Sequence, residues 1–482
     1  MANKPRAWWL AAAGVGGGLL LLVVAVAHAH AMLISSDPPA GGTVTRTLSR
    51  VRLVFSEPLE AALSEIGVVD VQGRTRKLVV ATDPRNVRAL VGPIDALPDG
   101  AYRVVWRTVS ADGHPVEGSF IFHVRVSAAA ATAAFDAAHP GPLPPEVPVE
   151  EALAWGPSLA GAPLIPSILR GAALGALMAA GGLLAFIGWA GKSPAPGRAG
   201  GSAAARVDSG RATRLALALA GAATLLLLAH LLAWLVEATP GHSLDGDWVR
   251  RALGTRSGSM EVWRIGLTLV ALWAAALARR PRVAALFAFG ALAASGAIGH
   301  PAAIVPLASI PAKALHLMAS ALWLGGLLWL ATAGTADHAS FHREAERVSS
   351  VALVAVIVVA LSGVAQTLLF LPSVRALFTT AYGWLVLAKA AGMVILIAFG
   401  AHHRYRVLPA LGGVNAPASS KYLVAGADGS EVLRRSVWRE IGVMAIVIAL
   451  GGLLAYVSPN ATEAATMAAT SLELDPGIAW AR

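Results

Sequence analysis

The order of hydrophobic and polar positions divides the chain into a short apolar leader, a β-patterned stretch and a long series of apolar segments. The leader, residues 1–29, has a basic start, an apolar run and Ala27-His28-Ala29, a small-x-small triplet of the kind that signal peptidase cleaves. We therefore predict a signal peptide whose removal makes His30 the first residue of the mature chain. A cut before His28 and an uncleaved anchor are the alternatives, and each leaves the following domain outside.

Residues 30–127 have the pattern of an all-β domain. Short runs rich in β-branched and aromatic residues alternate with turn signals, and these runs cover residues 51–55, 65–71, 77–80, 102–108 and 119–126. Many short strands at this spacing, in a stretch of about 100 residues, predict a sandwich or a barrel with one hydrophobic core. His123 falls inside the last run, where we expect a structural role.

The remainder of the chain predicts a membrane bundle behind a linker. Residues 128–164 are rich in Ala and Pro, which is typical of a semi-extended linker. Eight hydrophobic segments follow within residues 165–458, at 167–190, 213–237, 262–278, 283–300, 311–333, 348–371, 383–402 and 437–457. Each is near the ~20 residues that a helix needs to cross a bilayer, so we predict eight transmembrane helices. Residues 459–482 would form an outward-facing tail.

Composition and charge predict that this bundle lies in a membrane with a defined orientation. The chain is 56% hydrophobic and only 14% charged, which is too apolar for a soluble protein of 482 residues. Basic residues concentrate in the loops on the side opposite the β-domain, whereas the outer loops 301–310 and 372–382 contain one basic residue, Arg375, and the 238–261 loop is mixed. Because basic loops stay in the cytoplasm, we expect a multi-pass protein of the cytoplasmic membrane with its β-domain on the periplasmic or extracellular side.

The charge pattern and the absence of cysteine limit the chemistry. No basic patch is interleaved with stacking aromatics, so we expect no nucleic-acid partner. Without thiols, a transition metal would need His, carboxylate, Met or backbone ligands. Cleavage before His30 would place an α-amine beside its imidazole, a nitrogen pair that suits Cu(II). Asp112-Gly113-His114, on a predicted loop between two strands, offers a carboxylate and a second imidazole, although such a triplet taken alone is more often a polar turn.

Three motifs of the β-domain resemble the copper-resistance C (CopC) family. They are His30-Ala-Met-Leu-Ile-Ser-Ser-Asp-Pro38, Phe55-Ser-Glu-Pro58 and Trp106-Arg-Thr-Val-Ser-Ala-Asp-Gly-His-Pro115. The resemblance implies a cupredoxin-like (Ig-like Greek-key) β-barrel that binds Cu(II) through His30, Asp112 and His114. Some members add a Met-rich Cu(I) site, which we expect to be absent because Met32 is the domain's only methionine.

Motifs of the apolar half resemble the copper-resistance D (CopD) family. They are His300-Pro301, Ala314-Leu-His316 with Ala321-Leu-Trp-Leu-Gly-Gly326, Tyr382-Gly383 with Lys389, and Leu433-Arg-Arg-Ser436 with Glu440. His403-Arg404 departs from the Asn-Arg that the family often has at this point. A CopC domain fused to a CopD domain implies copper handling at the inner membrane, most often uptake.

Ionisable residues inside the predicted spans are candidates for a copper path, because charge is costly in hydrocarbon. His230 in the second span and His316 in the fifth lie at comparable depth below the outer surface, and His300 ends the fourth span on the same side. We predict that copper passes from the outer domain to His300 and then to His316 or His230. Met318 would add a soft ligand for Cu(I).

Other polar residues of the membrane half receive supporting roles or none. Glu237 shares a helix face with His230, and Lys389 could form an ion pair with Glu237. The alternative is that these His and Lys side chains bond only to carbonyl groups at the membrane interface. Four histidines on the cytoplasmic side could receive a released ion, but we favour their interpretation as solvated loop residues: His338, His342, His402 and His403.

The sequence thus predicts a copper-binding and copper-transport protein, with copper moving inward and no catalysed covalent reaction or catalytic residue. Its predicted partners are copper ions, the lipid bilayer and a periplasmic copper chaperone, with Cu(II) in the outer domain and Cu(I) as a candidate in the bundle. One alternative is a b-type haem protein with His230 and His316 as ligands. Another is a histidine-brace copper oxidase or monooxygenase, which would need a substrate platform that the sequence near residues 112–114 does not offer.

Overall fold

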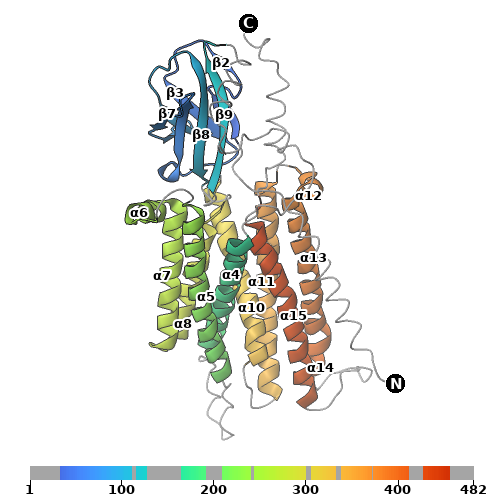
Figure 1. Cartoon of the computed structure of the whole chain (residues 1–482). Coiled ribbons are helices and arrows are strands. Elements are labelled where there is room, and N and C mark those ends of the chain that lie inside the picture. The colour runs from blue at the N-terminus through green and yellow to red at the C-terminus, as the bar shows by residue number, and fades with distance from the viewer. Residues whose placement is uncertain are drawn as a thin grey trace, which may run out of the picture.

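The computed structural model describes residues 33–110, 115–126, 164–190, 209–239, 244–299, 305–332, 338–371, 373–411, 427–455 and 457. A β-sandwich stands on one end of an elongated helical bundle (Figure 1). The predicted fold class, an all-β domain followed by an α-helical membrane bundle, is therefore confirmed.

Nine described strands form the outer domain: β1 (Leu33–Asp37), β2 (Thr43–Val44), β3 (Arg50–Phe55), β4 (Glu65–Asp70), β5 (Thr75–Leu78), β6 (Ala81–Asp83), β7 (Asn86–Pro93), β8 (Gly100–Val109) and β9 (Pro115–Val124). They build two sheets, in the orders β1-β3-β7-β6 and β2-β9-β8-β4-β5. In β3, Val51, Leu53 and Phe55 are buried while the residues between them are more exposed, the period of two of a half-buried strand. The core includes an edge-to-face pair of Phe55 and Trp106, with ring centroids 6.2 Å apart.

The sequence pattern does not predict β1, β2, β6 or β7. Three of these strands are short runs with few apolar side chains, and β7 is interrupted by Arg88 and closes with Gly92-Pro93. They are strands because β1 and β7 pair with the two edges of β3, β6 extends β7, and β2 pairs in parallel with β9. Pairing partners, rather than a local period, determine their structure.

Eight long helices form the bundle: α4 (Leu164–Ala190), α5 (Gly210–Glu237), α7 (Arg256–Ala276), α8 (Pro281–Gly296), α10 (Pro306–Thr332), α11 (His338–Phe370), α13 (Ala381–His402) and α15 (Ala427–Leu454). Each predicted span falls on one of them. Seven of these described helices are long and apolar enough to cross a membrane, and α8, with 16 residues, is shorter. At ~1.5 Å per residue α8 extends about 24 Å, less than the ~30 Å of a hydrocarbon core.

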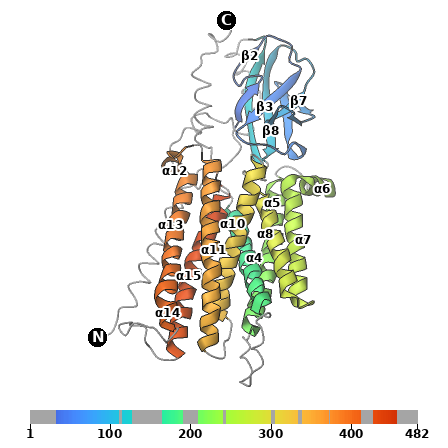
Figure 2. The ribbon, with the colours of Figure 1, turned by 180° about the vertical axis from the view of Figure 1, so that it is seen from behind.

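The central helix of the bundle is α4. It packs against α5, α8, α10 and α15, with α5, α7 and α8 on one side of the bundle and α11 and α13 on the other (Figures 1 and 2). Small residues allow the close approach: a Cβ added at Gly182 would lie 1.8 Å from the carbonyl oxygen of Ala321 on α10, and one at Gly452 of α15 would lie 2.8 Å from the Cα of Gly171. These contacts fix α10 and α15, which carry polar groups described below.

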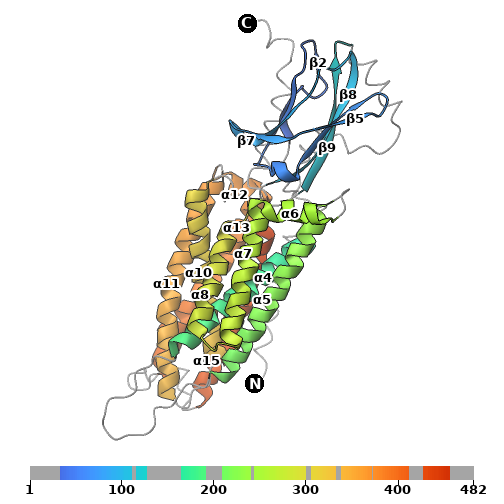
Figure 3. The same ribbon diagram turned by 90° about the vertical axis from the view of Figure 1, so that its left-hand side faces the viewer.

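The outer domain rests on the bundle through a hydrophobic contact. Leu63 of the 3₁₀ turn η1 (Ala61–Leu63) and Val109 of β8 pack with Trp234 of α5 and Trp248 of the short helix α6 (Gly246–Gly254). The sequence pattern predicts a loop where α6 forms. Asp245 caps this helix by accepting a hydrogen bond of 2.7 Å from the backbone N–H of Trp248. The cap therefore helps to hold α6, which lies under the outer domain (Figure 3), and to keep Trp248 in this contact.

A carboxylate lies beside this hydrophobic contact. Glu60, just before η1, accepts a hydrogen bond from the backbone N–H of Arg256, at the start of α7. Burial raises the pKa of Glu60, and the N–H and the charge of Arg256 partly offset that rise.

Val109 pairs with Pro115 across β8 and β9, so both residues lie at the end of the domain that faces the bundle.

Candidate metal site and buried polar groups

The predicted ligands His30, Asp112 and His114 lie outside the described residues, and so does His300. The structure describes the scaffold around the three outer ligands: the strand that begins three residues after His30, and the two strands that flank the predicted loop. The metal-binding roles of these ligands stay predictions, and the positions of the flanking strands determine whether the three outer ligands can reach one metal ion.

The described segments that flank the predicted ligands come together at one end of the sandwich. Leu33, at the start of β1, pairs with Phe55 at the end of β3. The chain then reaches Leu59, which forms a bridge with Ser110, directly before the predicted loop, and the next strand starts at Pro115. Strand register therefore brings the start of β1 to the same end of the domain as both flanks of the loop, and this end faces the bundle.

His230 belongs to a buried charged cluster in the outer half of the bundle. Its Nδ1 lies 3.5 Å from Oε1 of Glu261 on α7, and Arg264 forms an ion pair with Oε2 of Glu261. The three residues are at most 4% exposed. Because the guanidinium neutralises the carboxylate, the cluster does not need a proton on His230 to balance its charge.

Sequence reasoning found His230 but missed its partners. It placed Glu261 in an outer loop and passed over Arg264, whereas α7 begins at Arg256 and contains both. An acidic and a basic residue at i and i+3, directly ahead of an apolar run, are the signal that could have extended the predicted span.

His316 is held in a form that suits metal binding. Its Nδ1 lies 3.0 Å from Oγ of Ser362 on α11, and that hydroxyl donates its own hydrogen to the carbonyl oxygen of Val358 at 2.5 Å. Since a serine hydroxyl has one hydrogen and this one is directed to Val358, we assign the ring proton to Nδ1, which then donates to Oγ. In the neutral ring Nε2 then keeps its lone pair, which is the arrangement of a metal-binding histidine with a supporting hydrogen bond.

Among the other described residues of the prediction, Lys389 is close enough for its charge to act on His316, whereas Met318 lies on another face of α10. Met318 is two residues further along α10, a rotation of about 200° around the helix axis, and it packs against the hydrophobic core of the bundle. It therefore lies on another face of α10 than His316, and its role as a soft ligand for Cu(I) stays a prediction. Lys389 on α13 lies beside α15, where a Cβ added at Gly451 would be 3.5 Å from its Nζ. Glu237 lies on α5, and its pairing with Lys389 stays a prediction.

The haem alternative, with His230 and His316 as ligands, stays a prediction. Nδ1 of His230 lies beside Glu261 on α7, and Nδ1 of His316 lies beside Ser362 on α11. These contacts concern Nδ1 alone, whereas a haem iron would bind Nε2.

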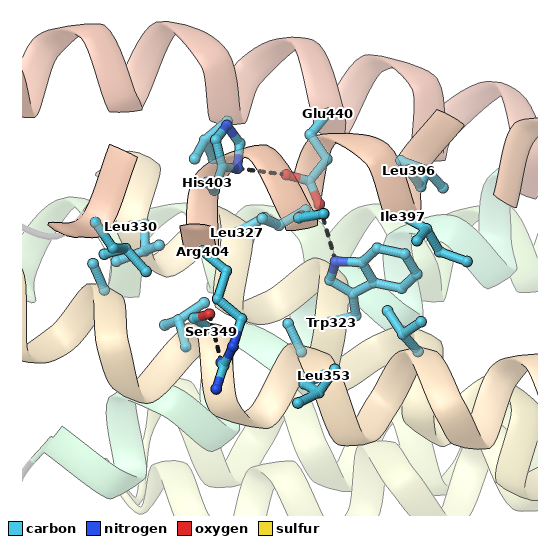
Figure 4. A pocket seen from close by; sticks show the side chains of 18 of the residues that line it. Trp323, Leu327, Leu330, Ser349, Leu353, Leu396, Ile397, His403, Arg404 and Glu440 are labelled. Carbon is cyan, nitrogen blue, oxygen red and sulfur yellow. Dashed lines mark hydrogen bonds and ion pairs between the residues drawn. The ribbon is translucent and has the colours of Figure 1, made fainter. Parts of the chain in front are cut away.

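A second carboxylate–imidazole pair lies in the inner half of the bundle (Figure 4). Glu440 of α15 is 1% exposed, and its Oε2 lies 3.2 Å from Nδ1 of His403. Its Oε1 accepts a hydrogen bond of 3.1 Å from Nε1 of Trp323 on α10. Nε2 of His403 lies 2.7 Å from Oγ of Ser436. Both ring nitrogens of His403 therefore have polar partners.

The burial of His403 shows that its interpretation as a solvated loop residue is wrong. The helix α13 continues into η2, a π-helical turn at His403–Val407, and this wider turn carries His403, which is 8% exposed. A cavity of about 240 Å³ lies beside the pair, with mainly apolar walls. Arg404 also lines the cavity, and its guanidinium donates to Oγ of Ser349 on α11 at 3.0 Å (Figure 4).

Comparison with known proteins finds two families in this chain. The family model of the CopC domain matches residues 33–125, and that of copper resistance protein D matches residues 342–454. Copper transport protein CutJ of Bacillus subtilis is 26% identical over 399 residues, which are 78% of this chain and 68% of that protein.

Two further relatives match the outer domain alone. Copper resistance protein C of Escherichia coli is 34% identical over 109 residues, which are 20% of this chain and 84% of that protein. The crystal structure of CopC from Methylosinus trichosporium OB3b matches with 31% identity and a TM-score of 0.19, covering 20% of this chain and 93% of that chain. The chain therefore belongs to the CopC family through its outer domain, and it joins that domain to a copper resistance protein D domain in one polypeptide.

Proposed function

We propose that this protein binds Cu(II) in its outer domain and transports copper inward across the cytoplasmic membrane through its helical bundle. The observation that carries the proposal is the docking of the two parts. Val109 and Pro115, which flank the predicted metal loop, lie at the end of the sandwich that packs on α5 and α6. A metal held at this end would be delivered directly to the outer mouth of the bundle.

The Cu(II) ligands of this proposal are His30, Asp112 and His114. Support comes from the strand register, which brings Leu33 to the same end of the domain as Ser110. An α-amine, two imidazoles and a carboxylate would give the nitrogen and oxygen donors that Cu(II) prefers. The resting copper of the outer domain is accordingly cupric.

His316 is the residue of the bundle that we propose to receive copper. Its Nδ1–H is committed to Ser362, so Nε2 offers a lone pair to an ion. Imidazole accepts either oxidation state of copper, and Cu(I) is our proposal for the species inside the bundle. His300 stays the proposed entry residue, and His230, paired with Glu261, is a weaker candidate ligand.

Charge supports the orientation and the direction. Three arginines at the connection of α7 and α8, Arg279, Arg280 and Arg282, lie at the end of the bundle far from the outer domain (Figure 3). Basic connections stay in the cytoplasm, so the outer domain would lie outside and could receive copper from a periplasmic chaperone. A membrane potential that is negative inside favours inward movement of a cation by about 2.3 kcal/mol per charge per 100 mV.

The proposal is tested by changing His316 and leaving the outer domain intact. We expect His316→Ala to reduce copper accumulation in cells that express the full chain, while the Cu(II) electron paramagnetic resonance signal of the purified protein stays the same. Ser350→Ala on α11 is the control, because Ser350 is exposed and bonds only to its own helix in the described contacts. Unchanged accumulation in His316→Ala would count against the path through the bundle.

A further inference from the structure

We propose that Glu440 and His403 form a proton-binding site that opens to the cytoplasmic side, and that copper transport requires release of the proton held there. This inference rests on the proposed copper transport and adds an ion that the predicted copper path does not contain. It starts from the burial and the partners of one carboxylate in the inner half of the bundle.

The charge of the pair makes one proton part of its resting structure. Glu440 is 1% exposed, and an isolated ionised carboxylate is costly in a low-dielectric interior. Its partners Trp323 and His403 offer one neutral donor and one titratable ring. The two groups together are neutral when they share a single proton, either as carboxylate with imidazolium or as carboxylic acid with imidazole.

Among the described residues of the cavity wall, one fixed positive charge lies near that proton, and it has another partner. The ionisable residues on the cavity wall are Glu440, His403 and their neighbours Arg404 and Tyr405, whereas the walls from α10 and α11 contain none. The guanidinium of Arg404 is directed to Ser349 of α11.

Further ionisable groups of the packed helices have their own contacts. On α11, Glu344 pairs with Arg347 at 2.8 Å and accepts a hydrogen bond from Trp329. The described part of α4 contains one ionisable residue, Arg170, near its outer end, and the ring of His402 lies 6.1 Å from that of His403. On α15, Arg434 stacks over the ring of Phe341, and Arg439 is exposed.

Two polar contacts of His403 outline a route for the proton. Oε2 of Glu440 lies 3.2 Å from Nδ1 and accepts no hydrogen bond among the described residues, so a proton on this oxygen would pass to Nδ1. The ring then releases the proton of Nε2 to Oγ of Ser436, which is partly exposed and gives its own hydroxyl hydrogen to water, so ring and hydroxyl end with the number of protons they had. Ser436 lies in the first part of α15, at the end of the bundle away from the outer domain (Figure 1).

The helix α10 connects this pair to the proposed copper ligand. Trp323 and His316 are seven residues apart, which is two helical turns or about 10.5 Å, and they lie on the same face. The hydrogen bond from Trp323 to Glu440 strengthens when the carboxylate is ionised. Loss of the proton therefore favours the position of α10 in which Trp323 bonds to the ionised Glu440. A copper ion that passes His316 then restores the positive charge that the departing proton removes.

Transport into proteoliposomes of the full chain, with the internal pH set when the vesicles form, tests the coupling. We expect copper uptake to rise as the interior of the vesicles becomes more alkaline, by up to about tenfold per pH unit, which is the largest change that release of a single proton can give. Glu440→Gln imitates the protonated acid, so its uptake should stay low and independent of pH. His403→Asn keeps a hydrogen-bonding side chain without a proton-carrying ring and should also be independent of pH.

Glu344→Gln serves as the control, since Glu344 is a carboxylate of the same half that is paired with Arg347, and it should keep the pH dependence. Infrared difference spectra of the purified protein between acid and alkaline pH give an independent readout: subtracting the difference spectrum of Glu440→Gln from that of the parent protein should leave one carboxylic-acid band, that of Glu440. Absence of that band, or an undiminished pH dependence in Glu440→Gln, overturns the coupling and leaves copper transport standing. A normal band without copper uptake at any pH overturns the transport itself, and the coupling with it.

Discussion

The bundle contains the same residue pair twice, a buried histidine beside a buried glutamate, and the two pairs differ in what else surrounds the carboxylate. In the outer half, Glu261 lies between His230 and the guanidinium of Arg264. In the inner half, Glu440 lies between His403 and the indole N–H of Trp323. The outer carboxylate has a permanent positive partner, whereas the inner one has a titratable partner and a neutral donor.

This difference assigns different tasks to chemically similar pairs. A guanidinium keeps its charge at every physiological pH, so the outer cluster is a fixed ion pair that joins α5 and α7. The inner pair balances its charge with a proton that can leave. The identity of the third residue, rather than the His–Glu pair itself, therefore decides whether a site is structural or exchanges protons.

The largest expected effect is on stability, at the outer cluster. Arg264→Met would leave Glu261 buried without its positive partner, and we expect a loss of about 3–5 kcal/mol in the free energy of unfolding in mixed micelles. Arg404→Met at the inner cavity should cost much less, because Arg404 is half-buried and its described contact is one serine hydroxyl. The double variant Arg264→Met/Glu261→Gln should recover most of the loss. Equal losses at Arg264 and Arg404 would remove the distinction between the two sites.

An intermediate effect is expected where a neutral hydroxyl orients a histidine. Ser362→Ala removes the acceptor of the His316 Nδ1–H, so the ring loses the hydrogen bond that fixes its tautomer. Loss of such a supporting bond typically weakens metal affinity by about tenfold to a hundredfold, and the copper concentration for half-maximal uptake should rise accordingly. Ser350→Ala is the matched control on the same helix. A half-maximal concentration that is the same in both variants would show that Ser362 does not orient a ligand.

The smallest expected effect extends the comparison to a carboxylate outside the membrane. Burial raises the pKa of Glu60 where the outer domain meets α7. Between the ordinary pKa of 4.5 and the raised pKa, Glu60 therefore holds more proton when the outer domain is docked on the bundle than when it is undocked. Docking should therefore be stronger at pH values below the raised pKa and weaken as pH rises through it. Spin-label distances between the outer domain and α6, measured across this range, would detect the change. Glu60→Gln should remove it, and a pH response that persists in this variant would assign it to another group.

Much of the architecture could be predicted because it depends on local patterns. Each of the eight apolar segments became a helix, since a run of about 20 apolar residues has few other stable forms in a bilayer. The strands with a clear period of two were also found, whereas β6 and β7 depend on neighbours that pair with them. The helix α6 was missed because its stability comes from a cap and from Trp248 packing under another domain.

The polar clusters could be predicted only in part, because they join different helices. His230 was identified from its position in a span, but its contact with Glu261 depends on how α5 packs against α7. His403 was assigned to solvent because the sequence does not show that α13 continues as a π-helical turn toward Glu440 of α15. His316 and Trp323 are seven positions apart on α10, and the hydrogen bond that links Trp323 to the inner pair likewise appears only in the folded bundle.

The central claim is that copper enters the bundle from the site of the outer domain. Radioactive copper uptake by cells that express equal amounts of the full chain or of Asp112→Asn/His114→Ala tests it most directly, because both substitutions lie in the predicted metal loop and leave the docking residues Val109 and Trp248 in place. We predict that uptake falls to the level of cells without the protein. Undiminished uptake by the double variant would contradict the proposed delivery of copper from the outer domain to the membrane.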